Sequence, residues 1–240
     1  MCTVSFIPRK DSFVITSNRD EHISRSPAYK PKVELINGLK VVFPKDPKAG
    51  GTWFAVNEKN VAVVLLNGAF ENHKSTGNYE KSRGLVVLDI VGHHNPQIYL
   101  EETDLMNIEP FTVIVVEKGK VVELRWDGKD RFIELLDSSE SYIWSSATLY
   151  SKMAINKREE LFSKFIDEND INTSTIIDFH SNNHQDFQNG FVIDRASGLK
   201  TFSVTQAVLG KEKICLKHIN LLKDDTNTVE LPVNQLMNQF

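Results

Sequence analysis

Two short segments rich in β-branched and aromatic side chains begin the chain, and a polar connection separates them. Residues 2–7 and 12–17 each suit a strand, and the four residues between them, which open with proline, suit a turn. A turn centred on the middle of this connection places Cys2 opposite about Ser17. We therefore expect residues 18–20, which follow the second strand, to lie beside the start of the chain.

Cys2, at the start of the chain, is a candidate nucleophile. After removal of the initiator methionine, Cys2 bears a thiol and a free α-amine on the same carbon. The α-amine titrates near pH ~7.7–8.0 and the thiol near ~8.5, so one residue can supply a nucleophile and a base. Arg19 is expected to lower the thiol pKa, and Asp20 to hold or align the amine. The alternative is that Cys2 is a small buried residue at the start of a strand.

Length and composition are those of one globular domain spanning residues 1–240. The chain is 40% hydrophobic and 25% charged, which is sufficient for a substantial core. A formal net charge of −4 provides no basic surface for nucleic acid. We find no apolar run of membrane-spanning length and no secretory leader, and therefore expect a cytoplasmic protein. In that setting two reduced thiols, Cys2 and Cys215, are favoured over a disulfide.

The rest of the chain predicts strands first, then two blocks of helix, then strands again. This order fits two sheets between helical layers. Strands are expected at 33–36, 39–43, 51–57, 61–66, 111–117, 120–126, 142–147, 190–194, 199–205 and 212–219. Helices are expected at 79–92, 151–169 and 173–181. The segment 61–66 is apolar on both faces, which indicates a central strand that is covered on both sides.

Four motifs occur in order through about residue 90. They are Asn18-Arg19-Asp20-Glu21, Gly50-Gly51-Thr52-Trp53, Leu66-Asn67-Gly68 and Ser82-Arg83-Gly84. With the Met-Cys start, this set resembles the NRDE-domain proteins, also called the transport and Golgi organization family. The resemblance implies the N-terminal-nucleophile (Ntn) hydrolase fold, a four-layer αββα sandwich of the α+β class.

The opening of the chain is also similar to that of bile-salt hydrolases and penicillin V acylases. In those enzymes cysteine is the nucleophile, and an aspartate near the end of the second strand contacts its amine. Aligned on Asn18, Asp20 matches that aspartate. Arg19 does not match their arginine, which precedes the asparagine, and its role is therefore open.

Several residues are candidates to complete a site for acyl transfer. Asn67 ends a buried strand and can donate from its amide to an oxyanion; the alternative is a turn residue before Gly68. Ser146 stands where related acylases use an asparagine donor, and its shorter hydroxyl puts hydrolysis in doubt. Asn18, Trp53 and Ser146 are expected to contact the substrate, although an aromatic residue in a strand commonly belongs to the core.

Two functions remain open from the sequence. The first is an amidohydrolase or acyltransferase that acts on a small acyl amide or thioester, with Cys2, Asp20, Arg19 and Asn67 as its catalytic residues. The second is a non-catalytic relative that carries a small ligand such as haem or acyl-CoA, because the resembling family is linked to haem trafficking, lipid metabolism and Golgi organisation. We expect no metal and no cofactor, since His180 and His184 lack a third ligand at a fitting spacing. No residue indicates an oligomeric state.

Overall fold

The strands form two antiparallel sheets. The computed structural model describes residues 3–75, 77–168 and 170–234, and Cys2 lies outside them. Sheet A has the order β10-β1-β2-β11-β12-β13, and sheet B runs from β3 to β9 in sequence order. The strands are β1 (Thr3–Arg9), β2 (Ser12–His22), β3 (Tyr29–Ile36), β4 (Leu39–Lys45), β5 (Phe54–Asn57), β6 (Val61–Asn67), β7 (Phe111–Glu117), β8 (Lys120–Trp126), β9 (Arg131–Leu136), β10 (Tyr142–Ser145), β11 (Leu199–Gly210), β12 (Lys213–Asn220) and β13 (Asp225–Pro232).

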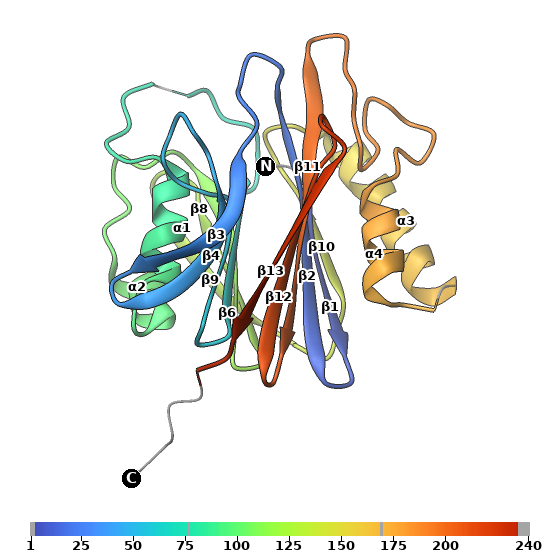
Figure 1. Ribbon diagram of the computed structural model, residues 1–240. Helices are drawn as coiled ribbons and strands as arrows, with labels where there is room; N and C mark the ends of the chain where they lie inside the picture. The colour runs from blue at the N-terminus through green and yellow to red at the C-terminus, as the bar shows by residue number, and fades with distance from the viewer. Residues whose placement is uncertain (1–2, 76, 169, 235–240) are drawn as a thin grey trace.

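Helices cover the outer face of each sheet, so that the molecule has four layers (Figure 1). Helices α1 (Arg83–Val91) and α2 (Pro96–Glu102) lie against sheet B, and α3 (Lys152–Glu168) and α4 (Thr173–His180) lie against sheet A. This arrangement is the αββα sandwich that the sequence predicted.

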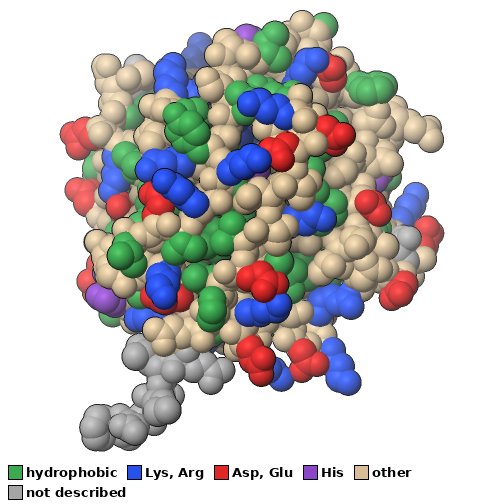
Figure 2. All heavy atoms as spheres, in the orientation of Figure 1, with side chains coloured by type: hydrophobic (Ala, Val, Ile, Leu, Met, Phe, Trp, Pro, Cys, Tyr) green, Lys and Arg blue, Asp and Glu red, His purple; other side chains and the backbone are tan. Residues whose placement is uncertain are grey.

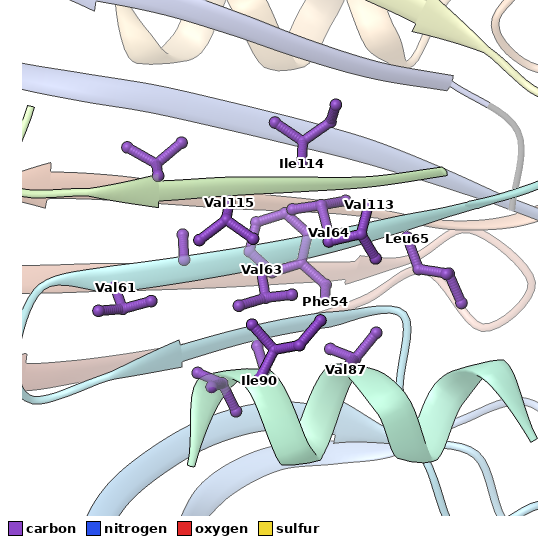
Figure 3. Close-up of a cluster of buried hydrophobic side chains, with 14 of the residues drawn as sticks. Phe54, Val61, Val63, Val64, Leu65, Val87, Ile90, Val113, Ile114 and Val115 are labelled. Carbon is purple, nitrogen blue, oxygen red and sulfur yellow. The ribbon is translucent and has the colours of Figure 1, made fainter. Parts of the chain in front are cut away.

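The main core fills the space between the sheets and extends under α1. Strand β6 is buried along its apolar length, as predicted for a strand covered on both sides. Val63 and Val115 point towards Val87 and Ile90 of α1, whereas Ile114 points towards sheet A (Figure 3). A second cluster packs sheet A against the other helical layer through Ile7, Val14, Phe162, Phe165, Ile176, Phe179 and Phe191.

The first hairpin is confirmed, and its register lies two residues from the approximate one that the sequence predicts. Val4, rather than Cys2, pairs with Ser17, and Thr3 pairs with Asn18. The reason is that β1 continues through Pro8 to Arg9, so that the turn consists of the next two residues alone. Thr3, the first residue of β1, therefore lies directly beside the Asn18-Arg19-Asp20-Glu21 segment.

Other differences from the predicted elements lie away from this hairpin. Residues 190–194 form no strand apart from a single bridge at Asp194, and α1 begins at Arg83, later than the predicted helix start. The sequence did not predict α2, β9 or β13. No described helix has the length and apolar character needed to cross a membrane. Figure 2 shows positive and negative side chains interspersed over the visible face.

Candidate functional site

The Asn18-Arg19-Asp20-Glu21 segment divides its side chains between the two faces of sheet A. Successive side chains of a strand point to opposite faces. Arg19 faces sheet B, where its guanidinium carbon lies 4.8 Å from the centre of the Trp53 ring. Asn18 and Asp20 face the helical side, where Asn18 contacts His180 of α4. The motif therefore serves two environments that are separated by the sheet.

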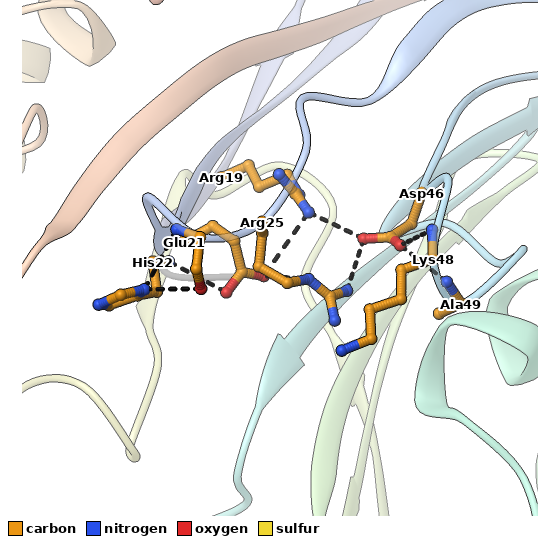
Figure 4. A network of polar contacts seen from close by, with 8 residues as sticks. Arg19, Glu21, His22, Arg25, Asp46, Lys48 and Ala49 are labelled. Carbon is orange, nitrogen blue, oxygen red and sulfur yellow. Dashed lines mark hydrogen bonds and ion pairs between the residues drawn. The ribbon is translucent and has the colours of Figure 1, made fainter.

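On the inner face, Arg19 belongs to a network of charged groups (Figure 4). Asp46, in the loop between β4 and β5, accepts hydrogen bonds from Arg19 Nη2 and Arg25 Nη2, both at 2.8 Å. Glu21 lies within ion-pair distance of both arginines, at 3.6 and 3.9 Å. Arg19 is only 1% exposed. The network thus holds a fully buried cation with two carboxylates beside it.

Desolvation disfavours both charges of the central pair, Arg19 and Asp46, and so shifts their pKa values in opposite directions. Burial lowers the pKa of Arg19, and the nearby carboxylates of Glu21 and Asp46 partly offset this effect. Burial alone raises the pKa of Asp46, but hydrogen bonds from the Ala49 backbone N–H and from Arg25 outweigh it, and the net pKa is lowered. Burial therefore opposes the charge on Arg19, whereas the hydrogen bonds to Asp46 favour its charged form.

A cavity of about 370 Å³ opens beside this network, and the four sequence motifs meet there. The volume lies within the usual range for sites that bind small molecules, roughly 300–1,000 Å³. Its walls come from the end of β2, the loop before β5, the end of β6 and the segment that enters α1. The lining residues taken from the motifs are Arg19, Glu21, Gly51, Thr52, Trp53, Asn67, Ser82, Arg83 and Gly84.

Two glycines allow the second and fourth motifs to interlock. A Cβ atom on Gly51 would lie 2.4 Å from the carbonyl carbon of Gly84, which is closer than packed atoms can approach. A Cβ atom on Gly84 would lie 2.9 Å from the Thr52 oxygen. The Thr52 N–H donates to the Gly84 carbonyl at 3.1 Å and joins the two segments. The first turn of α1 is consequently held against the loop that carries Trp53.

Three buried donors in the cavity wall have no hydrogen-bond partner among the described residues. They are Arg19 Nη1, Trp53 Nε1 and the hydroxyl of Ser82. Trp53 is 1% exposed, so the core placement that the sequence left open for this residue and its position in the cavity wall are both observed. Buried donors without partners carry a desolvation cost, which an acceptor in the cavity would remove.

Asn67 and Ser146 lie together at the end of β6. The Ser146 hydroxyl donates to the Asn67 backbone carbonyl at 2.9 Å and also lies 3.0 Å from the Thr148 hydroxyl. Ser146 is fully buried and is not among the residues lining the cavity. Asn67 is among the residues that line the cavity. Asn67 therefore reaches the cavity, whereas the Ser146 hydroxyl is already engaged in hydrogen bonds elsewhere.

On the helical side of sheet A, Asp20 accepts two hydrogen bonds from hydroxyl groups. Tyr150 donates to Oδ2 at 2.7 Å and Thr201 donates to Oδ1 at 2.6 Å. Arg158 of α3 lies over the Tyr150 ring at 3.7 Å and donates to the Thr3 hydroxyl at 2.7 Å. These contacts tie Asp20 to the described start of β1, and no sequence motif marks Tyr150, Arg158 or Thr201.

Asn18 is fully buried, and its side chain is occupied by the protein itself. Its amide nitrogen donates to the carbonyls of His180 and Phe191, at 2.8 and 2.9 Å. Its oxygen lies 2.5 Å from His180 Nδ1, and His180 Nε2 lies 2.7 Å from the Ser5 hydroxyl. With the Asn18 oxygen as acceptor, the His180 Nδ1–H donates to it and the Ser5 hydroxyl donates to Nε2. Asn18 thus anchors α4 to β2, away from the residues that line the cavity.

The residues of the cavity wall suit chemistry that uses hydrogen-bond donors and charged side chains. Among the described residues, no group of three or more histidine, cysteine, aspartate or glutamate side chains could hold a metal ion. The cavity wall instead offers cations, amide and indole donors and a helix start. Such groups bind and polarise oxygen atoms that carry negative charge.

Solved structures share the architecture of this chain. A mutant of the conjugated bile acid hydrolase from Clostridium perfringens matches with a TM-score of 0.57 and 12% identity, over 96% of this chain and 92% of that one. The N-acylethanolamine-hydrolyzing acid amidase ortholog of Caenorhabditis elegans matches with a TM-score of 0.62 and 12% identity. The match covers 87% of this chain and 93% of that one. At this identity the likeness shows the fold alone, and it confirms the predicted αββα fold, which these structures share.

The family is shown by the sequence itself. No curated protein gives a significant match. The family model described as Transport and Golgi organisation 2 matches residues 1–219, which include all four motifs and the residues around the cavity. The chain therefore belongs to the Transport and Golgi organisation 2 family.

Proposed function

We propose that the protein is an acyl-transfer enzyme with an N-terminal cysteine, which acts as an amidohydrolase or acyltransferase on a small acyl amide or thioester. After loss of Met1, the thiolate of Cys2 attacks the acyl carbon and the α-amine takes the thiol proton. Asp20 orients the amine, and the Asn67 amide donates to the oxyanion. The C–N or C–S bond of the substrate then breaks, and the leaving group takes the proton from the α-ammonium.

The second half of the reaction returns the enzyme to its starting state. Water or an acceptor amine attacks the acyl-cysteine while the α-amine accepts its proton. The bond between the acyl carbon and sulfur breaks, the acid or the new amide is released, and the thiolate takes the proton back from the α-ammonium. No redox partner is required, because no atom changes oxidation state overall.

The observation that carries the proposal is the pairing of Thr3. This first described residue of β1 pairs with Asn18 of β2 on one side and with Ser145 of β10 on the other. The described chain thus starts between the strand that carries Arg19 and Asp20 and the strand that leads to Ser146. We propose that Arg19 lowers the pKa of the Cys2 thiol and that Asp20 orients the Cys2 amine.

The alternative function is binding of a small ligand such as haem or acyl-CoA without turnover. The hydrogen bonding of Ser146 favours it, because a hydroxyl that already donates to the Asn67 carbonyl does not replace a second oxyanion donor. In that case Cys2 would contact the ligand or serve packing alone.

The chain offers a matched control for testing the enzyme, since its two cysteines are Cys2 and Cys215. Intact mass of the purified protein establishes whether Met1 is removed. The wild type, Cys2→Ala and Cys215→Ala are then incubated with p-nitroanilides of acetic, butanoic and octanoic acid. We expect release of p-nitroaniline from the wild type and from Cys215→Ala, and none from Cys2→Ala.

Alkylation by iodoacetamide at pH 7 gives an independent readout of the two thiols. Burial, followed by the nearby Glu230 carboxylate, raises the pKa of Cys215 and slows its reaction. We expect Cys2 to be modified first, as located by peptide mass. Equal release of p-nitroaniline by all three proteins, or faster alkylation of Cys215, would exclude the proposed mechanism and leave ligand binding.

A further inference from the structure

The three unpartnered donors of the cavity share one requirement, which is an acceptor. Arg19 Nη1 and Trp53 Nε1 belong to side chains that are each 1% exposed, and the Ser82 hydroxyl is itself buried. All three residues line the same cavity. A ligand group rich in oxygen lone pairs, with no hydrogen to donate, satisfies donors of this kind.

The start of α1 adds backbone donors at the same wall. The helix has nine residues, its N-cap is Ser82, and the Ser82 side chain makes no capping hydrogen bond. The first N–H groups of a helix have no partner within the helix, and the helix dipole places partial positive charge there. Ser82, Arg83 and Gly84 all line the cavity, so the helix start is part of its surface.

The cavity lining carries both positive and negative side chains, and this mixture still allows an anion to bind. The lining includes the cations Arg19, Arg25, Lys81 and Arg83 and the carboxylates Glu21, Asp46 and Glu109. Each carboxylate is already within ion-pair distance of an arginine: Asp46 and Glu21 pair with Arg19 and Arg25, and Glu109 pairs with Arg83 at 2.9 Å. The remaining donor capacity is therefore on the cationic side of the network.

We infer that this cavity contains an oxyanion subsite, formed by Ser82 and the start of α1 together with Arg19 and Trp53. The inference rests on the proposed function, because it assigns the substrate class of the same cavity. The substrate is an acyl compound that also carries a carboxylate or phosphate group. The subsite holds that group at α1, while the acyl carbon faces the end of β6, where Asn67 lies.

The test measures anion binding separately from catalysis. Cys2→Ala protein is titrated with inorganic phosphate and, in a second series, with acetate, and binding is followed by isothermal titration calorimetry. The same titrations are made with two double variants, in which the Cys2→Ala protein also carries Ser82→Ala or Trp53→Phe. Each second substitution removes one donor and keeps most of the side-chain volume. Ser163→Ala, on the exposed face of α3, is the matched control.

We expect saturable binding of at least one of the two anions. Loss of one charge-assisted hydrogen bond should raise the dissociation constant by about tenfold in Ser82→Ala and Trp53→Phe. The control should bind like its parent. The anion that binds more tightly assigns the group as phosphate or carboxylate, and unfolding midpoints of each variant show that the fold is retained.

The outcomes separate this subsite from the proposed reaction. Equal affinity in all folded variants, or no saturable binding of either anion, overturns the subsite whatever Cys2 does. Saturable binding that depends on Ser82 and Trp53 supports it even where Cys2→Ala and wild type show the same turnover, because the binding assay lacks the nucleophile.

Discussion

The Tyr150 hydroxyl donates a hydrogen bond to Asp20 Oδ2 at 2.7 Å and so joins residues 130 positions apart in the chain. Thr201 donates to the other oxygen of the same carboxylate, which fixes its plane. Asp20 is 3% exposed and Tyr150 is 5% exposed. A buried carboxylate that is held from both sides is suited to keep a neighbouring group in one orientation.

Tyr150→Phe removes the hydroxyl while keeping the ring that lies beneath Arg158. Because the lost hydrogen bond ends on a carboxylate, we expect the free energy of unfolding to fall by about 1.5–3 kcal/mol. Urea unfolding measures this loss. Tyr29→Phe, at a side chain that is 61% exposed, is the control and should change little. Equal stability of Tyr150→Phe and wild type would show that the hydrogen bond contributes nothing to the fold.

Three of the candidate residues named from the sequence, Arg19, Trp53 and Asn67, line the cavity, and each comes from a short motif. Asn18, Asp20 and Ser146 were candidates as well, but they are not among the lining residues. Asn67 is the last residue of the otherwise apolar strand β6, and Ser82 precedes helix α1, so each motif marks the boundary of an element. Asp46 and Tyr150 could not be predicted in the same way. Both lie in loops, and their partners are distant in sequence, so that no local pattern marks them.

The second prediction concerns Asp46, which is the common acceptor of two arginines. Asp46→Asn leaves the buried Arg19 without its nearest carboxylate. Removing one partner of a buried ion pair is costly, and we expect a loss of about 3 kcal/mol in the free energy of unfolding.

Asp11→Asn is the matched control for this change, because Asp11 forms an exposed ion pair with Lys211. Exposed pairs contribute little, so its unfolding midpoint should stay near that of wild type. Similar losses in the two variants would mean that the network around Arg19 is no more important for stability than a surface pair.

The errors in the predicted elements have physical causes. Proline at the start of a polar segment is typical of a turn, but it also fits a strand wherever its missing N–H is not needed, and β1 runs through Pro8. Residues 190–194 have strand-like side chains, yet their backbone groups bond to neighbouring loops: the Val192 N–H donates to Asn182 and the Asp194 N–H to Phe187. Strand β9 is exposed along most of its length and therefore lacks the apolar alternation that identifies a strand.

The contact between Gly51 and Gly84 predicts an order of effects for two alanine substitutions. Gly51→Ala would place its Cβ 2.4 Å from backbone carbon, and the backbone cannot move aside as a flexible side chain can. The closest approach for Gly84→Ala is 2.9 Å. We expect both to destabilise the protein, by about 1–3 kcal/mol for overpacking, with the larger loss for Gly51→Ala. Thermal unfolding of both variants tests the order, and a reversed order would contradict the observed contact.

The last prediction is a loss of stability in mild acid that depends on two buried histidines. Burial, with Arg158 nearby, lowers the pKa of His180 to about 3, and burial with Arg19 nearby lowers that of His218 to about 4. An unfolded histidine has a pKa near ~6.5. Between these values the unfolded chain binds protons that the folded protein does not, so stability is complete above pH ~6.5 and falls as the pH is lowered.

Urea unfolding at pH 7.5 and pH 5 measures this dependence. Each histidine should account for a loss of about 2 kcal/mol at pH 5, since each unit below the unfolded pKa costs about 1.4 kcal/mol. His180→Gln and His218→Gln should each reduce the difference between the two pH values by about that amount, even where the variant is less stable at pH 7.5. A difference unchanged in both variants would show that neither imidazole is held neutral in the fold.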